Sequence, residues 1–195
     1  EINYYRSLRA SYTDAPTRAW LDLFIAQRRM GFGQEPEQMM SELRRLGESA
    51  ASPDGVRRVA LRSLGNELYA RERYDEAVET WRLGLGLASD NWELNNNIAY
   101  TMSAKLGRHE EALELAERAV EADPTRSEPY DTLATIYIAL GKLDEAGQMI
   151  EMGERRSRSF EARATITITR AKLELARGDR KAAAADLQEA RDILR

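Results

Sequence analysis

The chain has 195 residues, of which 32% are charged and 43% are hydrophobic, and its net charge is −4. This nearly balanced charge argues against a nucleic-acid-binding domain, which usually carries a strong basic excess. The absence of cysteine excludes disulfides, thiolate catalysis and cysteine-based metal sites, and no apolar run is long enough to span a membrane. Few prolines and scattered glycines favour helices over a β-sandwich or barrel.

The start of the sequence is Glu1 rather than methionine, with no signal-peptide pattern. We therefore expect either that a leader was removed or that the sequence is an excised fragment. Basic residues are nearly all arginine, which indicates GC-rich coding. We expect a bacterial protein that is not inserted in a membrane, in the cytoplasm ahead of the periplasm.

Residues 1–57 are expected to form divergent and partial helix pairs. Three groups of apolar residues at helical spacing indicate three helices: Ile2, Tyr5, Leu8 and Tyr12; Trp20, Leu23 and Phe24; and Met39, Leu43 and Leu46. Pro16 opens the second of these helices, and Gly31-Phe32-Gly33 is expected to form the turn that follows it. The first group resembles the second helix of a pair whose first helix is missing.

Three series of small residues recur through the rest of the chain. The series are Gly65, Ala99, Ala134 and Ala171; Ala77, Ala112, Ala146 and Ala183; and Gly84, Ala119, Gly153 and Ala190. Each series advances by 34 or 35 residues and then by 37. Because the three series shift together, they indicate a repeated structural unit.

The repeated unit is expected to be a pair of antiparallel helices. Small residues let the two helices approach closely, and larger apolar residues fill the space around them: Leu61, Leu64, Leu68 and Trp81; Ile98 and Met102; and Tyr130, Leu133, Tyr137 and Ile150. Gly107, Gly141 and Gly178 stand where the first helix must stop. The pattern predicts an all-α solenoid of about 10–11 helices.

The well-formed units are expected at residues 58–91, 92–126 and 127–160, and a degenerate unit at 161–195, in one continuous solenoid. In the last unit Thr165–Thr169 alternates like a strand, but the repeat context favours a helix. Arg170 and Glu174 occupy positions that are apolar in the earlier units. The second helix shows an apolar stripe: Ala183, Leu187, Ala190 and Leu194.

Residues 58–160 resemble the tetratricopeptide repeat. The motifs that carry the resemblance are Tyr74-Asp75-Glu76-Ala77, Leu143-Asp144-Glu145-Ala146 and, less closely, His109-Glu110-Glu111-Ala112. These motifs specify a fold strongly and a function hardly at all. The resemblance implies that the solenoid is a right-handed superhelix and that it is a protein-interaction scaffold, in which the first helix of each pair lines a concave groove.

Residues that could suggest catalysis have a simpler structural interpretation. His109 is the sole histidine of the sequence, so a catalytic triad or a histidine-rich metal site is not expected. The acidic pairs Asp75-Glu76, Glu110-Glu111 and Asp144-Glu145 open helices, where negative charge is favourable. Gly84-Leu85-Gly86 does not continue as a phosphate-binding loop. We expect a protein that is not an enzyme and needs no cofactor or metal.

Arg155, Arg156 and Arg158 form a basic cluster between the third and fourth units. Such a cluster could contact an acidic partner or a phosphate. The alternative is a solvated helix end, where basic residues are favoured by the helix dipole.

The resemblance places a set of polar and aromatic residues on the concave face. The proposed partner-binding residues are Arg62, Asn66, Tyr69, Asn96, Asn97, Tyr100, Asp131, Thr135 and Ile138, with Ser63, Ser103 and Thr132 beside them. Amides, hydroxyls and tyrosines suit an extended peptide, whose backbone must exchange water for other hydrogen-bond partners. The alternative is that these are simply exposed polar residues.

Some tetratricopeptide co-chaperones grip the carboxyl-terminal tail of a chaperone with a two-carboxylate clamp. Arg62, Asn66 and Asn97 resemble part of that clamp. Glu128 and Thr132, however, stand where it needs two cations. A carboxylate beside Glu128 would be repelled, so this version of the binding site is rejected.

The leading hypothesis is a non-catalytic scaffold that holds a peptide or protein segment in the concave groove. One alternative is a self-associating assembly platform built from the irregular ends, giving a homo-oligomer. The other is the recruiting or regulatory arm of a larger enzyme or of a secretion or assembly system.

Overall fold

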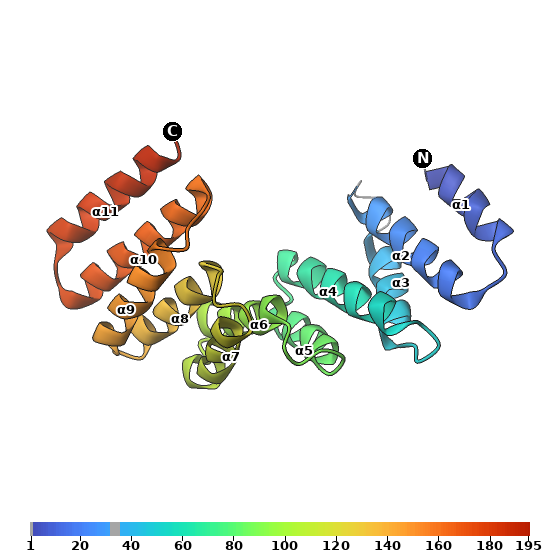
Figure 1. The fold of residues 1–195 in the computed structure, drawn as a ribbon, viewed down its shortest axis with the longest axis horizontal. Helices are drawn as coiled ribbons and strands as arrows, with labels where there is room; N and C mark the ends of the chain where they lie inside the picture. Colours follow the sequence, from blue (N-terminus) through green and yellow to red (C-terminus); the bar gives the residue numbers. More distant parts are fainter. Residues whose placement is uncertain (1, 32–35) are drawn as a thin grey trace. The chain divides into compact units, whose positions relative to one another are not determined.

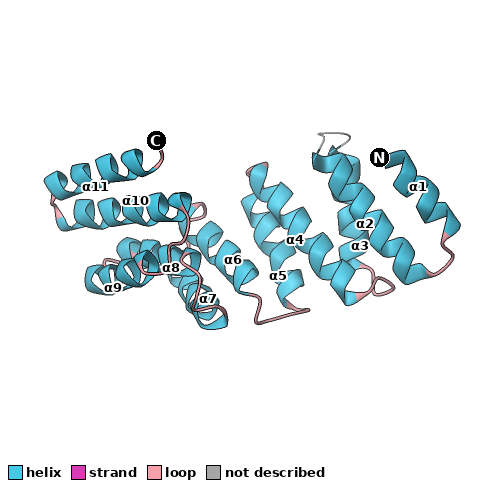
Figure 2. Ribbon diagram, turned by 45° about the horizontal axis from the view of Figure 1, so that its top comes forward, coloured by secondary structure: helices cyan, strands magenta, loops and turns pink. Residues whose placement is uncertain are grey.

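The computed structural model describes residues 2–31 and 36–195. In this part of the chain there are eleven α-helices and no strand (Figures 1 and 2). The all-α fold class and the expected number of helices are therefore confirmed. Phe32 and Gly33 of the turn expected after the second helix lie outside the described residues.

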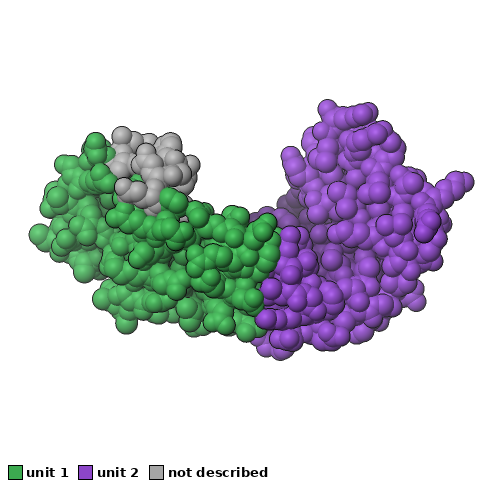
Figure 3. All heavy atoms as spheres, turned by 180° about the vertical axis from the view of Figure 1, so that it is seen from behind, with its two compact units in different colours: residues 1–89 green, residues 90–195 purple. Residues whose placement is uncertain are grey.

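The chain divides into two compact units, residues 1–89 and 90–195 (Figure 3). Unit 1 contains α1 (Ile2–Ser11), α2 (Ala15–Gly31), α3 (Pro36–Glu48), α4 (Asp54–Ala70) and α5 (Tyr74–Leu85). Unit 2 contains α6 (Trp92–Ala104), α7 (His109–Ala122), α8 (Glu128–Ala139), α9 (Leu143–Glu154), α10 (Phe160–Arg177) and α11 (Arg180–Ile193). The boundaries of the individual repeats stay a prediction.

Unit 1 shows that one aromatic residue of the expected N-terminal core lies elsewhere. The buried face of α2 is formed by Ala19, Leu23 and Ala26, whereas Trp20 remains 47% exposed. The Trp20 ring instead covers the backbone at Gly55, where an added Cβ would lie 3.1 Å from it. Trp20 therefore lies at the edge of the buried face, whose centre is formed by Ala19, Leu23 and Ala26 at successive spacings of four and three residues.

The expected packing of α3, α4 and α5 is confirmed. Met39, Leu43 and Leu46 are buried on α3, as are Leu61, Leu64 and Leu68 on α4. Trp81 of α5 is 2% exposed and its indole lies against the backbone of Gly65. The absence of a side chain at Gly65 therefore allows α4 and the indole to approach closely.

Unit 2 is built from three helix pairs, α6 with α7, α8 with α9, and α10 with α11. The first helices of the pairs are neighbours, since α8 contacts both α6 and α10. Small residues mark the close approaches: Ala99, Ala112, Ala134, Ala146, Ala171 and Ala183 are all buried. At Gly153 an added Cβ would lie 2.9 Å from Ile166 Cδ1, so this glycine admits the next pair.

The ends of the first helices follow the expected turn chemistry, with one exception. Gly107, Gly141 and Gly178 have φ angles of 69°, 73° and 88°, the left-handed region that favours glycine. The corresponding residue in unit 1 is Glu72, with a φ of 61°. Glutamate is a poor residue for this conformation, because its Cβ approaches the following carbonyl oxygen.

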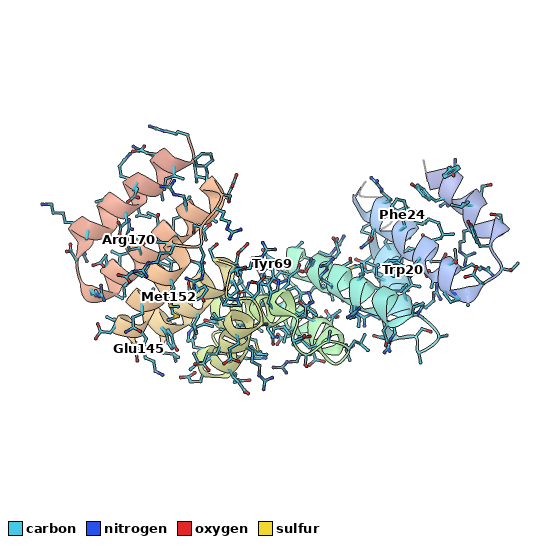
Figure 4. The ribbon with its side chains drawn as sticks, viewed as in Figure 1. Trp20, Phe24, Tyr69, Glu145, Met152 and Arg170 are labelled. Atoms are coloured by element: carbon cyan, nitrogen blue, oxygen red, sulfur yellow. The ribbon has the colours of Figure 1, made fainter. Side chains whose placement is uncertain are left out.

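The structure explains two irregularities in the sequence of the fourth repeat, residues 161–195. Residues Thr165–Thr169 lie within α10, so the helix expected there is confirmed. Arg170 Nη1 lies 2.5 Å from Glu154 of α9, and its Nη2 lies 2.8 Å from Asp186 and 2.7 Å from Glu189 of α11. Arg170, labelled in Figure 4, thus joins three helices through charge where the earlier units use apolar contact.

The apolar stripe expected on α11 is only half buried. Ala183 and Ala190 are buried, whereas Leu187 and Leu194 are exposed. Only the small residues of the stripe are therefore buried in unit 2.

Candidate partner-binding site

The first helices of unit 2 enclose a hollow of about 380 Å³, called here the inner hollow. Its lining residues are Asn96, Asn97 and Tyr100 of α6; Ser127, Glu128, Asp131 and Thr132 at α8; and Ser159, Glu161, Ala162, Thr165 and Ile166 at α10. Four of the sequence-predicted binding residues, Asn96, Asn97, Tyr100 and Asp131, therefore lie in one place.

Helix α6 turns Asn96, Asn97 and Tyr100 toward the hollow, and a capping residue fixes where this helix begins. The side chain of Asn91 accepts a hydrogen bond from the Leu94 backbone N–H at 2.9 Å, which caps the helix. Leu94, Ile98 and Ala99 then occupy the buried face. This register leaves Asn97 half-buried and Tyr100 37% exposed at the hollow.

Two side-chain oxygens of residues that line the hollow lack hydrogen-bond partners. Asn96 Oδ1 and Asp131 Oδ1 are both buried, and neither has a partner within the described residues. Burial raises the pKa of the Asp131 carboxyl, because removal from water disfavours its charged form. The Thr169 hydroxyl and the positive charge of Lys172 oppose this shift.

Helix α10 contributes residues that the sequence analysis missed. Alignment of the repeats places the groove-lining residues of each first helix close to its small residue, which is Ala171 in α10. In the structure, α10 lines the hollow with Glu161, Ala162 and Thr165, well before Ala171. The physical reason is the longer amino-terminal part of α10. It begins eleven residues before Ala171, whereas α8 begins six residues before Ala134. The larger step of 37 residues between units is the sequence signal for this extension.

Two further predicted residues of α8 do not line the hollow. Thr135 is half-buried further along the helix. Ile138 packs against the buried cluster that includes Ala134, Ala146 and Ile150. Ile138 therefore contributes to the core of unit 2 at the margin of the inner face.

The predicted residues of unit 1 form a separate group on α4. Asn66 Oδ1 accepts a hydrogen bond from the Trp81 indole N–H at 3.2 Å. The ring of Tyr69, labelled in Figure 4, lies 5.4 Å from that of Tyr74 and 6.2 Å from that of Trp81, measured between centroids. Arg62 is half-buried on the same helix. Asn66 and Tyr69 thus already contact their own helix pair.

The arginine cluster borders a second hollow of about 510 Å³ beside the first. Arg156 donates hydrogen bonds to the backbone oxygens of Pro124 at 2.6 Å and Met152 at 2.7 Å. Its guanidinium also stacks over the Tyr130 ring at 4.5 Å. Arg156 is therefore a structural link between α8 and α9, while Arg158 lines the second hollow.

The residues considered for catalysis have structural roles. His109 Nδ1 lies 2.9 Å from Ser103 Oγ at the start of α7, where it joins the two helices of its pair. The three acidic pairs lie in the first turns of α5, α7 and α9, as expected. Within residues 2–31 and 36–195 no group of acidic and histidine side chains could hold a metal ion. In the same part of the chain, no helix combines the length and hydropathy needed to cross a membrane.

The paired helices define a helical-repeat protein, and comparison with known proteins identifies the type of repeat. Residues 103–166 match the family model of the tetratricopeptide repeat. The TPR repeat-containing thioredoxin TTL4 of Arabidopsis thaliana is 30% identical over 86 residues, which is 44% of this chain and 12% of that protein. The inactive TPR repeat-containing thioredoxin TTL3 is 28% identical over 106 residues, or 54% of this chain and 14% of that protein. The chain thus spans a small part of these relatives.

Solved structures extend the likeness to nearly the whole chain. MamA from Desulfovibrio magneticus RS-1 has a TM-score of 0.72 and 18% identity, covering 92% of this chain and 97% of that one. BtubC from P. vanneervenii has a TM-score of 0.74 and 19% identity, covering 98% and 86%. YrrB, described as a TPR protein with an unusual peptide-binding site, has a TM-score of 0.70 and 20% identity, covering 96% and 90%. Residues 103–166 thus match the tetratricopeptide repeat, and the chain shares the helical-repeat solenoid fold of these structures.

Proposed function

We propose that this protein is a non-catalytic interaction scaffold that binds an extended peptide or protein segment across the inner faces of α6, α8 and α10. The observation that carries this proposal is the inner hollow with its two unpartnered oxygens, Asn96 Oδ1 and Asp131 Oδ1. Leaving a buried polar atom without a partner costs about 1–3 kcal/mol, so a ligand that donates hydrogen bonds there gains free energy on binding.

The rest of the lining suits a peptide backbone. Asn97 offers an amide, Thr165 and Ser159 offer hydroxyls, and Tyr100 offers a ring and a hydroxyl at the rim. An extended segment needs donors and acceptors for its main chain, together with apolar contact for some side chains. YrrB, which shares the fold, is described as having a peptide-binding site. We propose Arg62, Asn66 and Tyr69 of unit 1 as a separate contact surface.

The test is a selection of linear peptides from a displayed random library on the immobilised protein. The Asn97→Ala plus Tyr100→Ala double variant should bind the selected peptides at least about tenfold more weakly, since it loses a hydrogen-bonding amide and an aromatic contact. Its circular dichroism and melting curve should stay close to those of the unaltered protein, because neither side chain is in the buried core.

A matched control is available in unit 1. Asn3 and Tyr12 are exposed, and Tyr12 is 43% exposed, close to the 37% of Tyr100. The Asn3→Ala plus Tyr12→Ala variant removes the same two side-chain types and should bind the selected peptides normally. Equal binding by the two double variants would place the binding site outside the inner hollow.

Self-association is a second candidate function, supported by apolar side chains at the last two helices. Phe160 and Leu175 of α10, with Leu187 of α11 and Leu194 directly after it, are exposed. Exposed apolar groups of this kind are common at protein–protein contacts. Light scattering over a range of concentrations tests this role. A strictly monomeric protein at the highest concentration would exclude it.

A further inference from the structure

The charge of the inner hollow is negative. Three carboxylates line it, those of Glu128, Asp131 and Glu161, and none of the described residues that line it is a lysine or an arginine. Arg126 Nη1 lies 4.0 Å from Glu128 Oε1, and the Arg126 guanidinium also stacks over the Trp92 ring at 4.9 Å. Lys172 acts on Asp131 from α10 without lining the hollow.

The carboxyl groups at the rim and at the base of the hollow have different surroundings. Glu161 lies in the first turn of α10, where its own backbone N–H and the Ser159 hydroxyl lower the pKa of its carboxyl. Glu161 therefore stays ionised at neutral pH. Asp131 is deeper, its Oδ1 is buried, and no described group donates a hydrogen bond to that oxygen.

We propose that the inner hollow receives a cationic side chain, lysine or arginine, of the bound segment, with Asp131 Oδ1 as its buried acceptor and Glu128 and Glu161 at the rim. This inference rests on the proposed peptide-binding function and adds the chemical class of the ligand. The bound ammonium or guanidinium group supplies the missing donor, and hydrogen bonds between charged groups are the stronger kind.

Other ligand chemistries fit this hollow less well. A carboxylate or phosphate would be repelled by the carboxylates of Glu128 and Glu161, and an apolar side chain would leave Asp131 Oδ1 and Asn96 Oδ1 without donors. The acidic side chains of the described residues do not form a group that could hold a metal ion. A long cationic side chain satisfies acceptors that lie at different depths, because its apolar stem spans the hollow while its head carries the donors.

Small probes test the inference without a known partner. Nα-acetyl-lysine methylamide, its arginine equivalent, and the norleucine and glutamate equivalents are each titrated into the ¹⁵N-labelled protein. The lysine or the arginine probe should shift the backbone amides of residues around Asn96, Asp131 and Thr165. The norleucine and glutamate probes should leave these amides unchanged. Comparable shifts with norleucine would overturn the proposal.

Asp131→Asn keeps the side-chain shape and removes the charge. It should weaken binding of the cationic probe by at least about tenfold, which corresponds to loss of a charge-assisted hydrogen bond. Glu121→Gln removes an exposed carboxylate of α7 and is the matched control for net charge. An unchanged affinity in Asp131→Asn, or an equal loss in Glu121→Gln, would show that the carboxyl of Asp131 is not the acceptor.

The peptides from the library selection separate this inference from the proposed function. Peptides that depend on Asn97 and Tyr100 but contain no required lysine or arginine would leave the scaffold function intact and refute the cation site. Failure to select any peptide, together with binding of the lysine probe that is lost in Asp131→Asn, would refute the peptide-binding function and support the cation site.

Discussion

The contact between Gly65 and Trp81 allows a test of the packing in unit 1 by a double-mutant cycle. An added Cβ at Gly65 would overlap the Trp81 indole, which is 2% exposed. Gly65→Ala should therefore lower the free energy of unfolding by about 1–3 kcal/mol, the usual cost of overpacking a well-packed site. Trp81→Ala should lower it by about 3–5 kcal/mol, since the indole is lost and a cavity remains.

The magnitude for Trp81→Ala agrees with its buried surface. A buried tryptophan removes about 150–250 Å² from water, which at about 25 cal/mol per Å² amounts to about 4–6 kcal/mol. Asn66 loses its hydrogen bond from the indole but is itself exposed, so water replaces the donor and adds no large penalty. Tyr69 loses a ring neighbour at 6.2 Å, which is included in the estimate.

The informative result is the sign of the Gly65→Ala effect in the Trp81→Ala background. With the indole absent, the new methyl group meets no obstacle, and alanine is the better helix former by about 1 kcal/mol. Gly65→Ala should therefore stabilise the Trp81→Ala protein while it destabilises the unaltered one. The coupling free energy should amount to about 2–4 kcal/mol.

Urea denaturation followed by circular dichroism at 222 nm measures all four proteins without relying on tryptophan fluorescence. Neighbouring units can unfold in steps in a repeat protein, so the transition should be compared with a second probe of unfolding. If Gly65→Ala destabilises both backgrounds equally, the indole does not occupy the space beside Gly65. The packing described for α4 and α5 would then be wrong.

Three further predictions concern single substitutions, one in unit 1 and two in unit 2. Glu72→Gly should raise the free energy of unfolding by about 0.5–1 kcal/mol, because glycine accepts a φ of 61° without steric cost. Arg170→Ala should lower it by about 1–3 kcal/mol, since Glu154, Asp186 and Glu189 lose their shared cation. Asp131→Asn should stabilise the protein at neutral pH but not below the ordinary pKa of the carboxyl. Because the pKa of Asp131 is raised, the folded protein binds the carboxyl proton more tightly than the unfolded chain does. The free energy of unfolding of the unaltered protein therefore falls as the pH rises from the ordinary pKa of the carboxyl to its raised pKa.

Each of these predictions has a defined measurement and a contradicting result. Thermal melts test the prediction for Glu72→Gly, and a lower melting temperature for this variant would show that the backbone at Glu72 is not strained. Urea titrations at low and high salt decide the second, and the loss in Arg170→Ala should shrink with salt because ion pairs are screened. Urea titrations between acidic and neutral pH decide the third. A difference between Asp131→Asn and the unaltered protein that does not grow with pH would contradict the buried state of the carboxyl.

Local sequence pattern was sufficient for the secondary structure and for most of the core. Helical spacing of leucines located the buried face of α3 and α4, and glycines located the ends of α6, α8 and α10. These features depend on residues close together in the chain, whose geometry is fixed by the helix period and by steric limits on φ. The left-handed residue at position 72 escaped notice because no glycine marks it.

Convergence of side chains from different helices was decided by the tertiary structure. The sequence placed Asn96, Asn97, Tyr100 and Asp131 on an inner face, and the structure gathers them around one hollow. The sequence could not show that α10 extends far enough to line that hollow, nor that Ile138 packs into the core.

The physical reason is that repeat alignment assumes identical units. Three additional residues before α10 lengthen its amino-terminal part and move Glu161 and Thr165 to the hollow. The same assumption missed how Arg170 is accommodated, because its ion pairs come from α9 and α11 rather than from its own helix. The sequence by itself thus determined the repeating helix pairs, while their stacking determined which polar groups became buried without partners.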